Sequence, residues 1–180
     1  FQEQGAKALQ YGISEGYPEL RRLSEERLKN RYGIGRDFDQ LIIVSGGQQG
    51  MELSTKILTN EGDTVICENP SFIGSLNAFR SYGLKLRGVE MDEEGILPEA
   101  LEAIAASDPK VRFLYTIPTF QNPSGRTMTL ERRKAVLEIA KKYDFLIVED
   151  NPYGDLRYEG EDVAPIKSLD EEGRVIYVGS

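Results

Sequence analysis

Short apolar runs alternate with stretches of helical periodicity along most of the chain, and this alternation is what most constrains its fold. We expect strands at 41–44, 65–68, 85–91, 111–116, 145–150 and 175–180, with helices between them. Short apolar strands that alternate with helices of roughly 10 to 15 residues indicate βαβ units. The sequence therefore predicts an α/β fold, with a mostly parallel sheet flanked by helices.

Two segments outside this alternation carry their own expectations. Pro18 opens a stretch with leucines at helical spacing, and Gly33 is expected to end that helix. Residues 157–173 are acidic, and we expect an exposed loop there.

The chain has 180 residues, enough for one domain with a real core. It begins without methionine, and its last predicted strand runs to the final residue, Ser180. A strand end is an unusual place for a natural domain to stop. We therefore expect a fragment of a longer protein.

Composition excludes several classes of function. The net charge is −8 with a pI of about 4.8, which argues against a broad nucleic-acid surface. No apolar run is long enough to span a membrane, and the first residues given do not have the pattern of a signal peptide. The absence of histidine removes histidine-based triads and histidine metal sites, and no metal site is expected. The single cysteine, Cys67, suits a reducing cytoplasm.

Ligands bind outside the carboxyl ends of strands in open α/β sheets, so the residues there are the candidates. Ser45-Gly46-Gly47-Gln48-Gln49-Gly50 follows the run at 41–44 and opens a helix. Its glycines let backbone N–H groups approach a phosphate at the helix N-terminus. The alternative is an ordinary tight turn. The spacing matches neither a Walker loop nor the dinucleotide fingerprint.

Two further strands are followed by candidate ring contacts. Phe72 comes after 65–68, where an aromatic side chain can stack on a planar ligand or simply pack. Asn122 comes after 111–116 and precedes a proline, which holds its backbone extended. Its amide can then donate to a ligand, or it can satisfy the loop backbone.

The last two strands supply an acid, a phenol and a hydroxyl. Asp150 ends the run at 145–150, and Tyr153 follows three residues later. A buried carboxylate is costly unless it is paired, so Asp150 either meets a cationic ligand atom or caps a helix. Ser180 is a second possible phosphate donor. Together these residues describe a site for a flat, phosphorylated, protonatable ring, which fits pyridoxal 5'-phosphate.

Five motifs resemble the class I/II aminotransferases of the fold-type I pyridoxal-phosphate superfamily, in particular the branch of 2-aminoadipate, aromatic and kynurenine aminotransferases. They occur in the family's order and spacing and cover nearly the whole chain: "YGISEGYPELR", "SGGQQGMEL", "ENPSFIG", "IPTFQNPSG" and "VEDNPYGDLRY". Residues 1–180 would be part of the large cofactor-binding domain.

The resemblance implies a role for each phosphate contact. Gly47 and Gln48 would bind the cofactor phosphate through the helix N-terminus, and Ser180 would match a serine that contacts it. Tyr11 would match a tyrosine that reaches the phosphate of the neighbouring subunit, which implies a homodimer.

The resemblance also implies the ring contacts. Phe72 would stack on the pyridine ring, while Asn122 and Tyr153 would hydrogen-bond the ring hydroxyl oxygen. Asp150 would pair with the protonated ring nitrogen, and its pKa would fall beside that cation. The ring could then act as an electron sink.

One departure from the family's pattern limits these expectations. In the family, the lysine that forms the Schiff base follows the matching serine within a few residues, whereas this chain ends at Ser180. We therefore expect the catalytic lysine, the small C-terminal domain and the N-terminal arm to lie outside the segment. The segment alone is expected to be inactive and to bind the cofactor weakly.

Three functions stay open at this point. The first is amino-group transfer between an amino acid and a 2-oxo acid by the full-length protein. The second is a ligand-sensing module, since some winged-helix transcription regulators carry an aminotransferase-like domain. The third is a related pyridoxal-phosphate lyase. The identity of the amino acid cannot be inferred from the fold.

Overall fold

The computed structural model describes residue 5 and residues 9–180, and the chain divides into two compact units, Phe1–Val44 and Ser45–Ser180. Helix α2 (Pro18–Tyr32) dominates the first unit. A proline in its first turn costs no hydrogen bond, because that N–H would have no helical partner. Gly33 ends the helix with a φ of 68°, in the left-handed region that glycine adopts easily. Both ends agree with the sequence prediction.

The predicted strand at 41–44 is wrong, because the structure has no strand there. The N–H of Ile43 donates to the carbonyl of Glu15 at 2.9 Å. The Nε of Arg21 donates to the carbonyl of Leu41 at 2.8 Å. A strand exists only where a neighbouring strand completes its ladder, and these contacts satisfy the segment locally instead.

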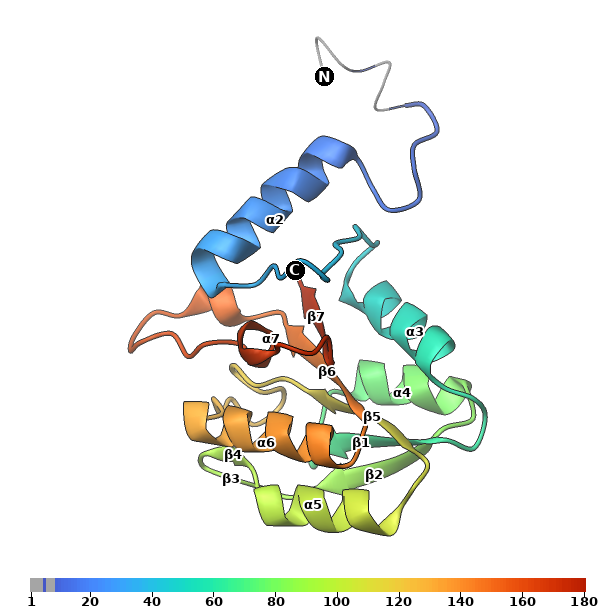
Figure 1. Ribbon diagram of the computed structural model, residues 1–180, viewed down its shortest axis with the longest axis vertical. Helices are drawn as coiled ribbons and strands as arrows, with labels where there is room; N and C mark the ends of the chain where they lie inside the picture. Colours follow the sequence, from blue (N-terminus) through green and yellow to red (C-terminus); the bar gives the residue numbers. More distant parts are fainter. Residues whose placement is uncertain (1–4, 6–8) are drawn as a thin grey trace. The chain divides into compact units, whose positions relative to one another are not determined.

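The second unit is built on a parallel sheet, as the sequence predicts. Within its described residues the sheet has five strands in the order β2-β1-β5-β6-β7, and every neighbouring pair is parallel (Figure 1). The strands are β1 (Thr64–Glu68), β2 (Lys85–Val89), β5 (Val111–Thr116), β6 (Leu146–Asn151) and β7 (Val175–Gly179). All of their carboxyl ends therefore lie at the same edge.

Helices cover both faces of this sheet (Figure 1). They are α3 (Gly47–Leu58), α4 (Ile73–Ser81), α5 (Pro98–Ser107), α6 (Leu130–Lys142), the 3-10 turn η1 (Gly154–Leu156) and the short α7 (Ile166–Leu169). Alternate strand residues point to opposite faces, so two cores form. Phe113 packs with the residues of α3 and α4, whereas its neighbour Leu114 packs with those of α5 and α6.

Two stretches of the second unit differ from the sequence predictions. The strand expected at 85–91 ends at Val89, and the chain then forms a small hairpin, β3 (Met91–Asp92) with β4 (Gly95–Ile96). The exposed loop expected at 157–173 contains α7, whose Ile166 is fully buried. The prediction missed this short helix because the acidic residues around it dominate the composition of the segment.

Arg133 is a fully buried cation on α6 that holds the loop following β5. Its guanidinium donates to the carbonyls of Pro118 and Met128 at 2.9 and 3.0 Å and to the hydroxyl of Thr119 at 2.9 Å. It also donates to the carbonyls of residues 163 and 164. Burial lowers its pKa to about 10.

We predict that Arg133→Met lowers the free energy of unfolding of the full-length protein by more than about 3 kcal/mol, because several buried carbonyls would lose their donors. Lys134→Met is the matched control, since Lys134 is exposed on the same helix, and its effect should stay within about 0.5 kcal/mol. Urea denaturation measures both values. Equal effects of the two substitutions would contradict this role of Arg133.

Glu68, the last residue of β1, is a fully buried carboxylate that the chain supplies with donors. It accepts hydrogen bonds from the hydroxyl of Thr116 at 2.6 Å, the N–H of Ile117 at 3.2 Å and the amide of Gln121 at 3.0 Å. Burial raises its pKa to about 7, despite these donors. Glu68 thus joins β1 to the loop that follows β5.

A pH dependence of stability follows from this pKa. The folded state binds the proton of Glu68 more tightly than the unfolded chain, whose glutamates titrate near 4.5. The contribution of Glu68 to stability should therefore fall as the pH rises from about 4.5 to about 7, by on the order of 3 kcal/mol at most.

Glu68→Gln isolates this effect in the full-length protein. A glutamine can donate to Thr116 and accept from Ile117 and Gln121, so the hydrogen bonds survive without the charge. We expect the variant to gain stability relative to the wild type between about pH 5 and about pH 8, as measured by denaturation at each pH. A stability difference that does not change with pH would show that Glu68 titrates normally.

Candidate functional site

The parallel register brings the predicted site segments to one edge of the sheet. Cys67 of β1 pairs with Tyr115 of β5, and Tyr115 pairs with Val148 of β6. Asp150 of β6 pairs in turn with Val178 of β7. The residues that follow these positions therefore leave the sheet side by side.

The N-terminus of α3 lies at this edge beside β7. A Cβ on Gly47 would lie 3.8 Å from Cγ1 of Val178, the residue paired with Asp150. Gly46 precedes the helix with a φ of 82°, a conformation that side chains rarely adopt, and no side chain caps the helix. Backbone N–H groups of the first turn and the positive end of the helix dipole can thus face an anion.

Phe72 and Gln48 both lie close to Gly74. A Cβ on Gly74 would lie 2.6 Å from the ring of Phe72 and 3.4 Å from Oε1 of Gln48. Only a residue without a side chain leaves room for that ring. Phe72 itself is 36% exposed, so part of its ring surface remains available for stacking.

Asn122 and Tyr153 are in direct contact. The Nδ2 of Asn122 donates to the phenol oxygen of Tyr153 at 3.1 Å, although 31 residues separate them in sequence. The loop after β5 and the turn after β6 thus present an amide and a phenol at a single point. Both groups can hydrogen-bond a ligand oxygen.

Asp150 is a largely buried acid with a single hydrogen-bond donor among the described residues. The phenol of Tyr115 donates to its Oδ2 at 2.9 Å. Burial raises the pKa of Asp150, and the bond from Tyr115 offsets this only in part. Tyr115 is itself buried and contacts the hydroxyl of Ser75 in α4.

Glu149, the neighbour of Asp150, is a buried carboxylate whose hydrogen bonds are supplied by the backbone. Its two oxygens accept the N–H groups of Ile166 and Lys167 at 2.9 and 2.8 Å, at the start of α7. Glu68 is likewise supplied with several donors. No ion pair joins Asp150 to another described residue, so Asp150 is suited to receive a cation from a ligand.

For two of the predicted site residues, Ser180 and Tyr11, the structure gives a position but no contact with the rest of the site. Ser180 follows β7 directly, next to Gly179, which pairs with Asn151 of β6. Its position after the last strand is therefore at the same edge. Tyr11 belongs to the first unit and is fully exposed, so its contact with a neighbouring subunit stays a prediction.

Sequence reasoning missed three residues that support the site, namely Glu68, Tyr115 and Gln121. Each is buried, and each hydrogen-bonds a residue of the edge or of its loops. Glu68 had a detectable signal, because a glutamate that ends an apolar strand must find donors nearby. Nothing in the sequence indicates which tyrosine reaches Asp150.

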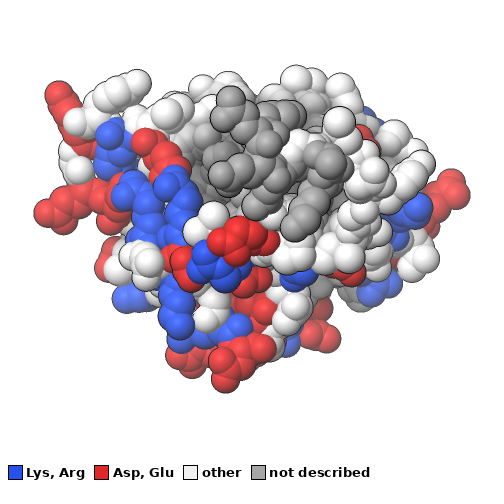
Figure 2. Space-filling model, turned by 90° about the horizontal axis from the view of Figure 1, so that it is seen from above, with Lys and Arg blue, Asp and Glu red and all other residues white. Residues whose placement is uncertain are grey.

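The charge of the surface has no single sign. Figure 2 shows lysine and arginine side chains interspersed with aspartate and glutamate on one face of the molecule. A nucleic-acid-binding face typically carries continuous positive charge. Among the described residues, no helix has the length and apolarity that crossing a membrane requires.

Comparison with known proteins gives close relatives. The aromatic-amino-acid aminotransferase 1 of Thermococcus litoralis is 45% identical over 99% of this chain and 44% of its own length. An uncharacterized HTH-type transcriptional regulator of Bacillus subtilis is 35% identical over 98% of this chain and 36% of its own. The structure of Pyrococcus horikoshii kynurenine aminotransferase superposes with a TM-score of 0.94 at 43% identity, over 99% of this chain and 45% of that one.

The chain thus spans less than half the length of these relatives. The family model described as aminotransferase class I and II matches residues 2–180, and the fold is that of a fold-type I aminotransferase domain. The chain therefore belongs to the class I and II aminotransferase family.

Proposed function

We propose that the full-length protein is a pyridoxal-phosphate-dependent aminotransferase that transfers an amino group between an amino acid and a 2-oxo acid. The observation that carries this proposal is Asp150, a largely buried carboxylate near the uncapped N-terminus of α3, with one hydrogen-bond donor and no ion pair among the described residues.

The residues at the edge fit pyridoxal phosphate. The uncapped N-terminus of α3, with Gly47 and Gln48, suits the phosphate. The part-exposed ring of Phe72 suits the pyridine face. The paired Asn122 and Tyr153 suit the ring hydroxyl oxygen. Ser180 supplies a further hydroxyl for the phosphate.

Asp150 is the residue that connects the site to the proposed reaction. When bound, the cofactor supplies an electron sink for removal of the substrate's Cα proton. Asp150 holds a proton on the ring nitrogen, because its buried carboxylate is stabilised most by an adjacent cation. Tyr115 fixes the carboxylate in place through its hydrogen bond. Asn122 and Tyr153 would hold the ring hydroxyl oxygen and so help to orient the ring.

The relatives support this function. The Thermococcus protein is named an aromatic-amino-acid aminotransferase, and the Pyrococcus enzyme was solved in complex with PMP. We further propose that the active protein is a cytoplasmic homodimer in which Tyr11 reaches the neighbouring subunit's phosphate. In this proposal residues 1–180 form part of the large domain, and the active-site lysine follows Ser180 in the full-length sequence.

A ligand-sensing module of a transcription regulator is the second candidate. The Bacillus relative is named an HTH-type transcriptional regulator, which favours keeping this candidate. A regulator would bind the cofactor through the same residues. Transaminase turnover by the full-length protein separates the two, because a pure sensor would retain cofactor absorbance without turnover. A pyridoxal-phosphate lyase would release product without a 2-oxo acid acceptor.

We predict that Asp150→Asn in the full-length protein lowers transaminase turnover on the order of a hundredfold or more, which is about 2.7 kcal/mol of barrier. The neutral amide cannot hold the ring nitrogen protonated, while the phosphate contacts remain. Cofactor absorbance should therefore persist in the variant. Turnover and absorbance are measured on the same preparation.

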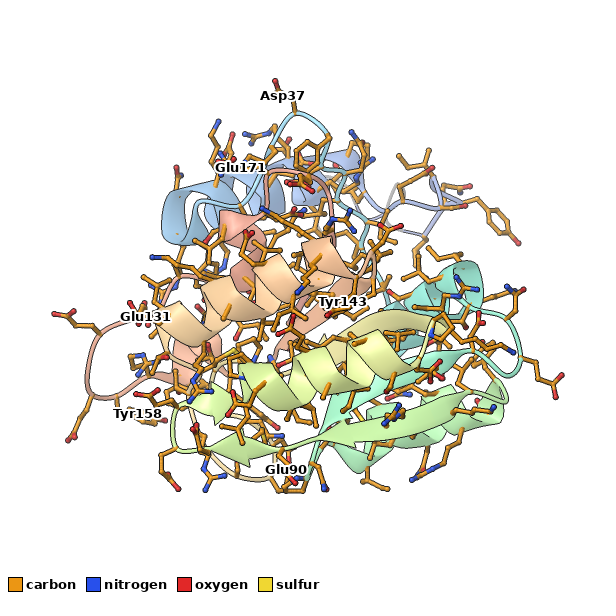
Figure 3. All side chains as sticks on the ribbon, turned by 60° about the horizontal axis from the view of Figure 1, so that its bottom comes forward. Asp37, Glu90, Glu131, Tyr143, Tyr158 and Glu171 are labelled. Atoms are coloured by element: carbon orange, nitrogen blue, oxygen red, sulfur yellow. The ribbon has the colours of Figure 1, made fainter. Side chains whose placement is uncertain are left out.

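Asp37→Asn serves as the control, because Asp37 is exposed in a loop of the first unit (Figure 3). It should leave both turnover and absorbance unchanged. Turnover near the wild-type level in Asp150→Asn would mean that Asp150 is structural. Loss of absorbance together with turnover would mean that it mainly holds the cofactor.

A further inference from the structure

A buried glutamine in the loop that carries Asn122 reaches across to the segment that carries Phe72. Gln121 is 3% exposed and directly precedes Asn122. Its Nε2 donates to Oε2 of Glu68 at 3.0 Å and to the carbonyl of Pro70 at 2.9 Å. Its Oε1 accepts from the N–H and the hydroxyl of Ser124 at 2.9 and 2.6 Å. Both donors and both acceptor positions of the amide are therefore used.

The hydrogen bonds of Gln121 connect the loop after β5 to the segment after β1, beyond the last backbone pair of these two strands. The ladder between β1 and β5 ends at the pair Cys67 and Tyr115. Beyond that pair, Gln121 reaches Pro70, which is two residues before Phe72 and 51 residues away in sequence. The link thus connects the stacking ring to the segment that carries Asn122.

The backbone around Gln121 is fixed as well. Its N–H donates to the carbonyl of Arg126 at 2.8 Å, and its carbonyl accepts from Gly125 at 2.6 Å. Phe120 has a φ of 53°, which a bulky residue keeps only where its surroundings hold it. The guanidinium of Arg157 lies 4.6 Å from the centre of the Phe120 ring. The loop that carries the amide of Gln121 is therefore held by backbone hydrogen bonds and by the contact of Arg157 with Phe120.

We propose that Gln121 is a positioning residue that sets the separation between Phe72 and Asn122, and thereby the orientation of the cofactor ring against Asp150. This inference rests on the proposed function. Gln121 has no need to touch the ring, because it acts through the two loops. A displacement of about 1 Å at a reacting group can lower turnover on the order of a hundredfold.

Gln121→Glu in the full-length protein tests the link with little change of shape. The new carboxylate keeps the bonds from Ser124 but faces Glu68 and the carbonyl of Pro70 without a donor. When the two carboxylates share a proton, one bond returns. Among the described residues, Asp150 is the other group whose charge acts on Glu68. We expect turnover at least about tenfold below wild type at about pH 8.5, with recovery toward acidic pH.

The visible circular dichroism of bound pyridoxal phosphate supplies a readout that does not depend on turnover. A ring that has lost its orientation should show a reduced band at about pH 8.5, while the absorbance of bound cofactor stays near the wild-type level. Gln40→Glu is the matched control, since Gln40 is exposed in the first unit. It should change neither the band nor the pH profile.

A double variant tests the hydrogen bond itself. In Glu68→Gln with Gln121→Glu, the amide at 68 can donate to the carboxylate at 121 and still accept from Thr116 and Ile117. Part of the dichroism and turnover should return at about pH 8.5. If Gln121→Glu does not fold, this double variant is compared with Glu68→Gln in its place.

The outcomes separate this inference from the function it rests on. If the wild-type protein shows neither cofactor absorbance nor turnover, the proposed function fails. If the wild type has both and Gln121→Glu matches it in dichroism and pH profile, the positioning role is overturned. A loss that the double variant does not relieve at any pH also overturns it, because it would reflect general damage to the core.

Discussion

The cost of burying carboxylates at the carboxyl edge of the sheet governs this structure. Glu68 ends β1, and Glu149 and Asp150 lie just before the end of β6 at Asn151. Burial raises the pKa of each of these three carboxyls. The three carboxylates differ in the number of hydrogen bonds that offset this cost. Glu68 accepts hydrogen bonds from three residues and Glu149 from two, whereas Asp150 accepts one from Tyr115. The least satisfied of the three is the one at the proposed cofactor ring.

The two well-supplied acids organise the segments around Asp150. Glu68 draws the loop after β5 toward β1, and Glu149 draws α7 against β6. Arg133 holds the same loop from the side of α6. Opposing attachments of this kind leave a loop few conformations, which suits a loop that must orient a ligand. The charges inside the fold thus serve to fix geometry as much as to add stability.

The sequence predicts this edge well because the information is local. A strand ends where apolar alternation ends, and parallel strands deliver their next residues to one edge, so Phe72, Asn122, Asp150 and Tyr153 could be grouped before any coordinates. The failures are non-local. The run at 41–44 is as apolar as a strand, but strand formation depends on a partner that the run itself does not specify.

The partners of buried polar groups are also non-local. Glu68 meets Gln121 across 53 residues, and Tyr115 meets Asp150 across 35. The periodicity of apolar residues along the sequence does not predict such long-range pairs. A sequence can show that a strand-end glutamate needs donors, yet many polar residues could provide them. Only the register of the sheet decides which ones do.

Asp150 and its neighbours also suggest how the site couples to its ligand. A carboxylate whose pKa is raised by burial gains most from a nearby cation, and by the same coupling it favours the protonated form of that cation. Tyr115 limits this gain but does not remove it, because one hydrogen bond replaces only part of the lost hydration. If Asp150 pairs with the ring nitrogen as proposed, that cation would offset the part of the burial cost that the bond from Tyr115 leaves.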